Sequence, residues 1–160
     1  SNNTREELCA SQPMPSDQVA LVTGGNRGIG KEVCRQLAAL EFTVILGARD
    51  LSKGQKVAKE LGRPPAAVLV TQLDVTSPES IQRAKNFVEQ KFGVLDVLIN
   101  NAGINFDTYQ QASSADIDNV KDTMETNLYG PWRCTMAFRP LLEKSENPRV
   151  VNVSSMLAPA

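Results

Sequence analysis

A glycine-rich turn near the start of the chain has the residue types and the spacing that a phosphate site needs. Its glycines follow the pattern Gly-x3-Gly-x-Gly and stand between an apolar run and a helical pattern. Backbone N–H groups approach a phosphate only where side chains leave room, and the start of a helix adds partial positive charge. A glycine-rich turn that binds no ligand is the alternative. The residues of this candidate site are Gly24, Asn26, Arg27, Gly28, Ile29 and Gly30.

Positively charged side chains follow the second apolar run, roughly 20 residues beyond the glycines, where a dinucleotide site meets the adenosine ribose. An acid at this place binds the ribose 2′-OH, whereas an arginine accommodates a 2′-phosphate. Arg49 comes first and Lys53 lies one helical turn later, while Asn26 and Arg27 belong to the same neighbourhood. Several cations suit a dianionic phosphate, so we expect NADP(H) as the cofactor. Solvated charges at a helix start are the alternative, and Asp50 favours it.

Small or polar residues follow the third and fourth apolar runs. Asp74 can accept a hydrogen bond from an adenine amino group while Val75 packs on the ring, although a turn-capping aspartate is nearly as good an explanation. Asn101, Ala102 and Gly103 leave room for a flat ligand, and a structural turn is the alternative. We predict all five as cofactor contacts.

Two further residues are candidates for the reaction itself. Ser155 follows the last apolar run and can donate a hydrogen bond to a substrate carbonyl. Asn127 falls on the apolar face of a long helical pattern, where a buried amide must be hydrogen-bonded; it either joins the helix to the sheet or holds a water for a proton path. Spacing alone favours the structural role for Asn127.

The composition excludes several other kinds of chemistry. The 160 residues contain no histidine, which excludes a Ser-His-Asp triad and most zinc sites, so we expect no metal. Three distant cysteines without a C-x-x-C pair indicate a reducing compartment, and we expect a cytoplasmic protein. A net charge of −1 favours neither nucleic acid nor a membrane as a partner. Residues 1–17 are expected to form a flexible tail without a signal sequence.

The elements that must position these residues alternate along the chain. Helical patterns link consecutive apolar runs, which indicates βαβ units in a parallel sheet with helices on both faces. We therefore predict an α/β fold: a Rossmann-type doubly wound parallel sheet of about five strands, incomplete, over residues 18–160. The expected strands are 19–23, 43–46, 67–70, 95–99 and 149–154. The expected helices are 29–40, 51–61, 78–92 and 116–142, with Ile29, Val33, Leu37 and Leu40 on one apolar face and Ile117, Val120, Met124 and Leu128 on another.

Five motifs in register together resemble the short-chain dehydrogenase/reductase family. They are Thr23-Gly24-x3-Gly28-Ile29-Gly30, Asp74-Val75, Asn100-Asn101-Ala102-Gly103, Asn127, and Asn152-Val153-Ser154-Ser155. The chain is most similar to the NADPH-dependent carbonyl reductases, which implies hydride transfer to a ketone, aldehyde or quinone. The resemblance implies that Ser155 holds the carbonyl oxygen, Asn127 positions a relay water and Asn101 lines the cofactor. It also implies that Asn26, Arg49 and Lys53 surround the 2′-phosphate.

The chain departs from the family in one respect. The family's proton donor belongs to a Tyr-x-x-x-Lys motif downstream of the serine, and the sequence contains no such motif before its last residue, Ala160. We therefore expect the amino-terminal part of a longer enzyme, inactive alone, working on a small-molecule carbonyl substrate as a monomer or a homodimer. The alternative is a nucleotide-binding protein without turnover that acts as a sensor or scaffold. A P-loop NTPase is poorly supported, because Glu32 stands where the hydroxyl residue belongs.

Overall fold

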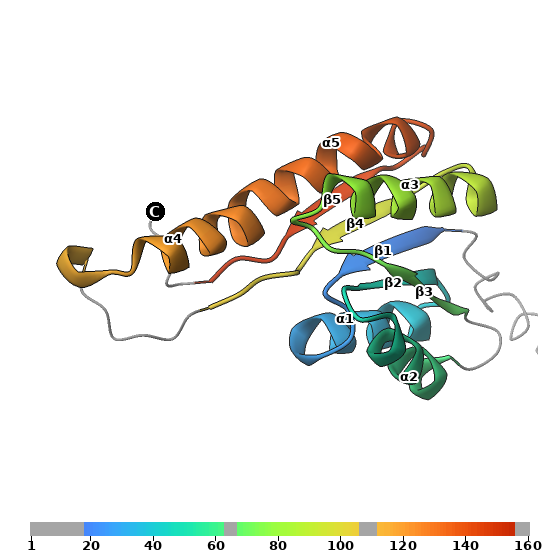
Figure 1. Cartoon of the computed structure of the whole chain (residues 1–160). Coiled ribbons are helices and arrows are strands. Elements are labelled where there is room, and N and C mark those ends of the chain that lie inside the picture. The colour runs from blue at the N-terminus through green and yellow to red at the C-terminus, as the bar shows by residue number, and fades with distance from the viewer. Residues whose placement is uncertain (1–17, 63–66, 106–111, 156–160) are drawn as a thin grey trace, which may run out of the picture.

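The computed structural model describes residues 18–62, 67–105 and 112–155 of the 160-residue chain. The expected flexible tail over residues 1–17 lies outside the described residues. Within them, one sheet is covered by helices on both of its faces (Figure 1). No helix in the described ranges is long and apolar enough to cross a membrane.

The sheet has five strands, all parallel, in the order β3-β2-β1-β4-β5. The strands are β1 (Val19–Thr23), β2 (Thr43–Ala48), β3 (Val68–Gln72), β4 (Val97–Asn100) and β5 (Arg149–Asn152). The first three strands run outward to one edge, and the chain then crosses back to place β4 on the other side of β1. Strand order therefore reverses between β1 and β4, which is the place where such sheets bind ligands. The predicted doubly wound α/β fold is confirmed, with strand ends shifted by one or two residues.

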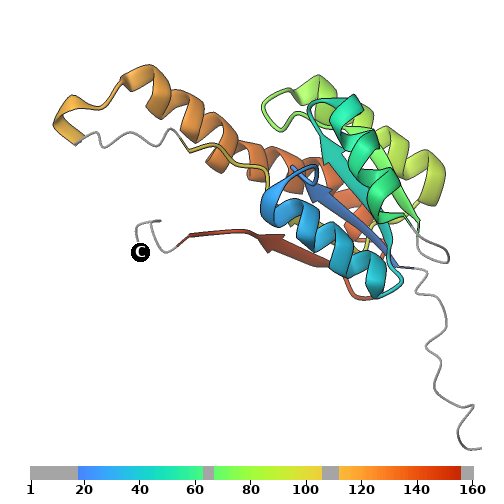
Figure 2. The same cartoon turned by 90° about the horizontal axis from the view of Figure 1, so that it is seen from below.

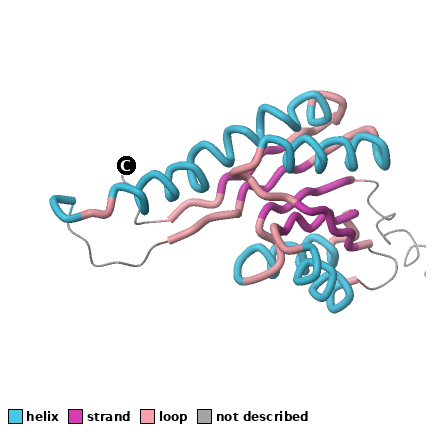
Figure 3. Tube along the Cα trace, in the orientation of Figure 1, coloured by secondary structure: helices cyan, strands magenta, loops and turns pink. Residues whose placement is uncertain are grey.

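Helices α1 (Gly28–Ala39) and α2 (Leu51–Leu61) cover one face of the sheet, and α3 (Pro78–Phe92) and α5 (Gly130–Leu142) cover the other (Figures 1 and 3). Alternate residues of β1 supply the two cores, because successive strand side chains point to opposite faces. Leu21 packs with the α3/α5 side, and Val22 packs with the α1/α2 side. This alternation confirms that β1 is buried on both faces.

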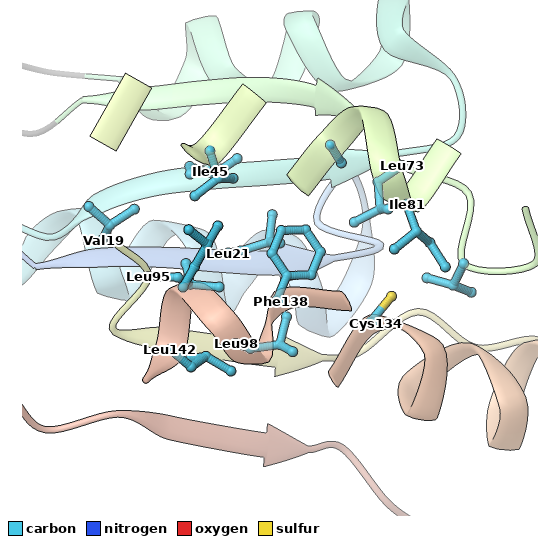
Figure 4. Packing of buried hydrophobic residues seen from close by; sticks show 14 residues of the cluster. Val19, Leu21, Ile45, Leu73, Ile81, Leu95, Leu98, Cys134, Phe138 and Leu142 are labelled. Atoms are coloured by element: carbon cyan, nitrogen blue, oxygen red, sulfur yellow. The ribbon is translucent and has the colours of Figure 1, made fainter. Parts of the chain in front are cut away.

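Phe138 of α5 lies in the middle of the larger core (Figure 4). Leu21, Ile81 and Leu98 surround it from β1, α3 and β4, and all are buried. Helix α3 starts as its sequence predicts: the Ser77 side chain accepts a hydrogen bond from the Ser80 N–H, and proline takes the first helical position. Its apolar face, which includes Ile81, is buried against the sheet.

The apolar face predicted for the first helix is wrong at both of its ends. Ile29 and Leu40 are 65% and 66% exposed, and the helix buries Gly30, Cys34 and Ala38 instead. Small side chains let α1 lie close to the sheet, so its buried side is the one with the smaller residues. Val33 and Leu37, in the middle of the predicted face, are partly buried and pack against the core on the α1/α2 side, while Ile29 lines the pocket described below.

The long helix predicted over 116–142 is present from Ile117 to Leu142, but it contains a π-helical segment. It consists of α4 (Ile117–Met124), the π-helix η3 (Glu125–Tyr129) and α5, after a short 3₁₀ turn, η2 (Ala112–Ser114). Helix α4 extends past the sheet (Figures 1 and 2), so nothing among the described residues covers its apolar row. The four residues expected to face a core are exposed: Ile117, Val120, Met124 and Leu128.

The end of α1 offers a test of local backbone strain. Glu41 has a φ of +64°, and its N–H donates to the Ala38 carbonyl (3.0 Å) while the Phe42 N–H donates to the Leu37 carbonyl (3.1 Å). This left-handed helix end favours glycine, since a side chain costs about 1–2 kcal/mol there. We expect Glu41→Gly to raise the free energy of unfolding by about 0.5–1 kcal/mol, after the entropic cost of glycine.

The matched control is Glu143→Gly, at the end of α5, where φ is −62°. This right-handed position gains nothing from glycine, so the same substitution lowers stability. Urea unfolding of both variants measures the difference, and a destabilised Glu41→Gly protein would contradict the argument.

Candidate functional site

A pocket of about 440 Å³ opens at the carboxyl ends of β1 to β4. Every residue predicted to contact the cofactor lines it: Gly24, Asn26, Arg27, Gly28, Ile29, Gly30, Arg49, Lys53, Asp74, Val75, Asn101, Ala102 and Gly103. Five further residues that the sequence did not single out as contacts complete the lining: Asp50, Leu73, Thr76, Ile104 and Thr126. Segments far apart in the chain thus form one hollow at the switch point between β1 and β4.

Two glycines of the turn have different surroundings: Gly30 is tightly packed, and Gly28 faces open space. A Cβ atom on Gly30 would lie 2.4 Å from the Gly24 carbonyl oxygen and 2.4 Å from Asn101 Nδ2, so only glycine fits there. Gly28 has a φ of +53°, and a Cβ on it would meet no atom within 4 Å. Gly30 therefore packs α1 against the turn, and the open space beside Gly28 leaves the helix start accessible from the pocket.

The start of α1 differs from the starts of α2, α3 and α4. Side chains cap α2, α3 and α4: Asp50, Ser77 and Asp116 each accept a hydrogen bond from a first-turn N–H. The residue before α1 is Arg27, which makes no side-chain cap, and the first turn of α1 contains no acid. The first N–H groups of α1 thus keep their partial positive charge for an external acceptor, which suits an anion.

Three cations surround the part of the pocket between α1 and α2. Arg27, Arg49 and Lys53 line it, and Asp50 is the acid among them. Lys53 Nζ lies 3.7 Å from Asp50 Oδ2 in an exposed pair, whereas within the described residues neither arginine forms an ion pair. The Ser52 hydroxyl donates to Asp50 Oδ1 (2.6 Å) and holds the pKa of Asp50 below its ordinary value. Asp50 is thus committed to the start of α2, and both guanidinium groups keep their charge for a ligand.

Asp74 takes the turn-capping role that the sequence left open. Its Oδ1 accepts hydrogen bonds from the Thr76 N–H (3.0 Å) and the Thr76 hydroxyl (2.8 Å), while its own N–H donates to the Ser80 hydroxyl (3.0 Å). These bonds shape the loop after β3 that carries Val75 into the pocket wall. The contact of Asp74 with an adenine remains a prediction.

Thr23 and Asn101 join the ends of β1 and β4. Thr23 Oγ1 accepts from the backbone N–H of Asn101 (3.0 Å) and of Ala102 (2.9 Å). The Asn101 side-chain amide donates in return to the carbonyls of Thr23 (2.9 Å) and Gly24 (3.2 Å). Sequence reasoning placed Asn101 at the site and quoted Thr23 in the glycine motif, but assigned Thr23 no role; its signal is a hydroxyl residue between the first apolar run and the glycines.

The two residues predicted for the reaction lie outside the pocket lining. Asn127 belongs to η3 and is exposed, so the expectation of a buried amide is wrong. Its Oδ1 accepts from the Ile104 N–H (2.9 Å) and its Nδ2 donates to the Ile104 carbonyl (2.8 Å), which ties the helix to the loop after β4. Ser155 follows β5, the edge strand that Asn100 links to β4 through Asn152 Oδ1 (2.9 Å). Catalytic roles for Asn127 and Ser155 remain predictions.

The described thiols are unsuited to nucleophilic chemistry. Cys34 and Cys134 are buried, and burial raises the pKa of each thiol to about 12, which leaves almost no thiolate near neutral pH. In the part of the chain that the structure describes, no group of three or more cysteine, aspartate or glutamate side chains could hold a metal ion. The chemistry of the pocket rests on backbone N–H groups and cations.

The Thr23 junction can be tested by removing its oxygen. Thr23→Val keeps the shape of the side chain but leaves the N–H groups of Asn101 and Ala102 without their acceptor. We expect a loss of about 2 kcal/mol in the free energy of unfolding, since a buried donor without a partner costs about 1–3 kcal/mol. Thr23→Ser keeps the oxygen and should retain most of the stability. A Thr23→Val protein as stable as wild type in urea unfolding would contradict the argument.

The sequence matches proteins whose names describe reductases and dehydrogenases. The family model described as short chain dehydrogenase matches residues 18–159. The (+)-neomenthol dehydrogenase of Arabidopsis thaliana is 40% identical over 158 residues, covering 86% of this chain and 53% of the relative. The carbonyl reductase (NADPH) 1 of Homo sapiens is 38% identical over 141 residues, covering 88% and 50%. The chain thus spans about half the length of these relatives.

Solved structures agree with the sequence matches. A metagenomic short-chain oxidoreductase in complex with NADP superposes with a TM-score of 0.81 at 29% identity, over 91% of this chain and 66% of that one. The menthone neomenthol reductase of Mentha piperita gives a TM-score of 0.78 at 36% identity, over 89% and 62%. The switch-point pocket, the motifs and these matches agree, and the chain belongs to the short-chain dehydrogenase/reductase family.

Proposed function

We propose that the protein is an NADPH-dependent oxidoreductase that reduces a ketone, aldehyde or quinone carbonyl to the alcohol, and that this chain carries its cofactor-binding part. The observation that carries the proposal is the uncapped start of α1, which opens into a pocket lined by Arg27 and Arg49. Helix N–H groups of this kind bind a pyrophosphate. Membership of an oxidoreductase family supports the reaction class.

The preference for NADPH rests on the cations after β2. Arg49 follows β2 directly, at the place where a dinucleotide site meets the ribose, and a guanidinium binds a phosphate bidentately. Asp50, which would favour a ribose 2′-OH, is engaged in capping α2. Two similar structures are complexes with NADP and with 5-hydroxy-NADP, which supports the same preference for this chain.

The residues of the chain would divide the work as follows. Backbone N–H groups at the start of α1 hold the pyrophosphate, and Arg49 with Lys53 and Asn26 holds the 2′-phosphate. NADPH supplies the hydride when bound. The Ser155 hydroxyl donates a hydrogen bond to the substrate carbonyl oxygen and orients it. The chain contains no Tyr-x-x-x-Lys motif for the proton, so on its own it should bind nucleotide without turning over a carbonyl.

The partners and location follow from the same reasoning. The proposed partners are NADP(H) and a small carbonyl compound, and a net charge of −1 favours neither nucleic acid nor a membrane. The buried free thiols Cys34 and Cys134 fit a reducing compartment, so we place the protein in the cytoplasm. We propose a monomer or a homodimer.

A nucleotide-binding protein without turnover is the second candidate. The position of Asn127 favours it, because both ends of its amide are engaged with the Ile104 backbone, and Ser155 lies outside the pocket lining. Such a protein would bind NADPH and act as a sensor or scaffold. NADPH oxidation by the complete protein with ketone, aldehyde and quinone substrates separates the two candidates.

The cofactor preference can be tested by charge reversal. We expect the protein to bind NADPH at least about tenfold more tightly than NADH, because the 2′-phosphate gains charge-assisted hydrogen bonds worth about 1.4 kcal/mol or more. Arg49→Asp should remove or reverse this preference, as measured by titration calorimetry with both nucleotides. Arg83→Asp on α3 makes the same charge change outside the pocket and should leave the preference intact. An unchanged preference in Arg49→Asp would contradict the proposed phosphate site.

The role of Ser155 can be tested in the complete protein. Ser155→Ala removes the proposed donor to the carbonyl oxygen, and loss of such a donor lowers kcat by about 10²–10³. NADPH binding should be unaffected, since Ser155 does not line the pocket. Ser154→Ala is the neighbouring control and should retain most of the activity. Equal activities of the Ser155→Ala and wild-type proteins would rule out the assigned role.

A further inference from the structure

The π-helix η3 lies where the long helical segment passes the pocket. Its five residues, Glu125–Tyr129, follow α4 and precede α5 without a break in the chain's helical course (Figure 1). π-turns are rare and occur often at functional sites, because the wider turn changes which side chains face a neighbour. Thr126, the buried residue of η3, lines the pocket.

Three contacts connect η3 to the pocket walls. The Asn127 amide is hydrogen-bonded to both backbone groups of Ile104, in the loop after β4. Gly130, the residue after η3, packs against Val75 in the loop after β3: a Cβ on Gly130 would lie 2.8 Å from Val75 Cγ2. Thr126, the residue before Asn127, itself lines the pocket. The π-turn thus faces both loops that close the far side of the pocket.

One arginine contacts both ends of the π-turn. Arg133 Nη1 lies 2.7 Å from Glu125 Oε2, and the Arg133 guanidinium lies 5.7 Å from the centre of the Tyr129 ring. Ion pairs on regular helices join residues three or four apart, whereas this one joins residues eight apart. Helical side chains lean toward the N-terminus, so Arg133 can lie over Tyr129 and reach Glu125. The first and last residues of η3 are therefore bridged by a single side chain.

A second ion pair of α5 provides a comparison. Arg139 Nε lies 3.2 Å from Glu143 Oε1, at the ordinary separation of four residues, with side chains 61% and 64% exposed. The Arg133 and Glu125 side chains are only 35% and 44% exposed. The Arg133–Glu125 pair also spans the π-turn, whereas the Arg139–Glu143 pair spans only regular helix at the end of α5.

We infer that Arg133 is a positioning residue: by binding Glu125 and Tyr129 it holds the π-turn, and through Asn127 and Gly130 the π-turn holds the loops of Ile104 and Val75 that wall the pocket. The inference rests on the proposed function only for the identity of the ligand, a nicotinamide dinucleotide. The effect on the Ile104 loop follows from the contacts alone.

The test reads the loop and the ligand separately. In the complete protein, Arg133→Met keeps the aliphatic part of the side chain and removes the charge. The Ile104 N–H donates to Asn127. We expect its hydrogen to exchange about tenfold faster, because the hydrogen bond opens more often when Arg133 no longer holds the π-turn. The dissociation constant of NADPH should rise about three- to tenfold, with KM for NADPH raised by more than kcat is lowered. Arg139→Met is the matched control and should change neither readout.

Two further variants keep the inference open to refutation. Glu125→Gln removes the partner charge and should reproduce the faster Ile104 exchange even if Arg133→Met fails to fold. Exchanging the charges, with Glu125→Arg and Arg133→Glu together, should restore slow exchange. Equal Ile104 exchange in Glu125→Gln and wild type would overturn the inference. Faster exchange in a protein that binds no NADPH would overturn the proposed function and leave the role of Arg133 standing.

Discussion

The pocket depends on how two neighbouring strands end. β1 and β4 lie side by side in the sheet, but the chain leaves β1 toward α1 on one face and leaves β4 toward the other. Where the two strands diverge, backbone groups lack partners in the neighbouring strand, and the side chains of Thr23 and Asn101 supply them. The Thr23 hydroxyl accepts from two N–H groups, and the Asn101 side-chain amide donates to two carbonyls. Because those donors and acceptors are satisfied within the turn, the N–H groups at the start of α1 are the ones left for a ligand.

Helix capping distinguishes α1, whose start opens into the pocket, from α2, α3 and α4. Asp50, Ser77 and Asp116 satisfy the first turns of α2, α3 and α4, whereas α1 begins at a glycine beside an arginine. Asp50 is the one acid among the cations of the pocket lining between α1 and α2. Its carboxylate accepts hydrogen bonds from the first-turn N–H of Lys53 and from the Ser52 hydroxyl, so it is engaged at the start of α2. One helix start in the sheet's hollow is thus both uncapped and surrounded by guanidinium groups.

The sequence predicted the strands, the doubly wound sheet and the residues lining the pocket, because each depends on local chemistry. Glycines at fixed spacing, apolar runs too continuous for a one-faced strand, and polar residues at strand ends are all visible along the chain. The sequence-based prediction was wrong where packing against other elements determines the structure. In α1 the periodicity identified Val33 and Leu37, which pack against the core, but missed the small residues Gly30, Cys34 and Ala38 that are buried there. The π-turn was missed as well, because hydrophobic periodicity does not distinguish it from an α-helical turn, although Gly130 and a proline follow it directly in the sequence.

The same geometry divides the site into two parts along the sheet. All residues that line the pocket come from the segments following β1 to β4 and from η3, and β5 contributes none of them. β5 is the edge strand, with Val150, Val151 and Val153 exposed, and Ser155 follows it. The pocket is therefore built from the segments that follow β1 to β4, and the residue proposed to hold the substrate comes from the segment after β5. The backbone pairing of β4 with β5 joins the two parts, and the hydrogen bond from Asn100 to Asn152 Oδ1 adds to it at the carboxyl ends of both strands.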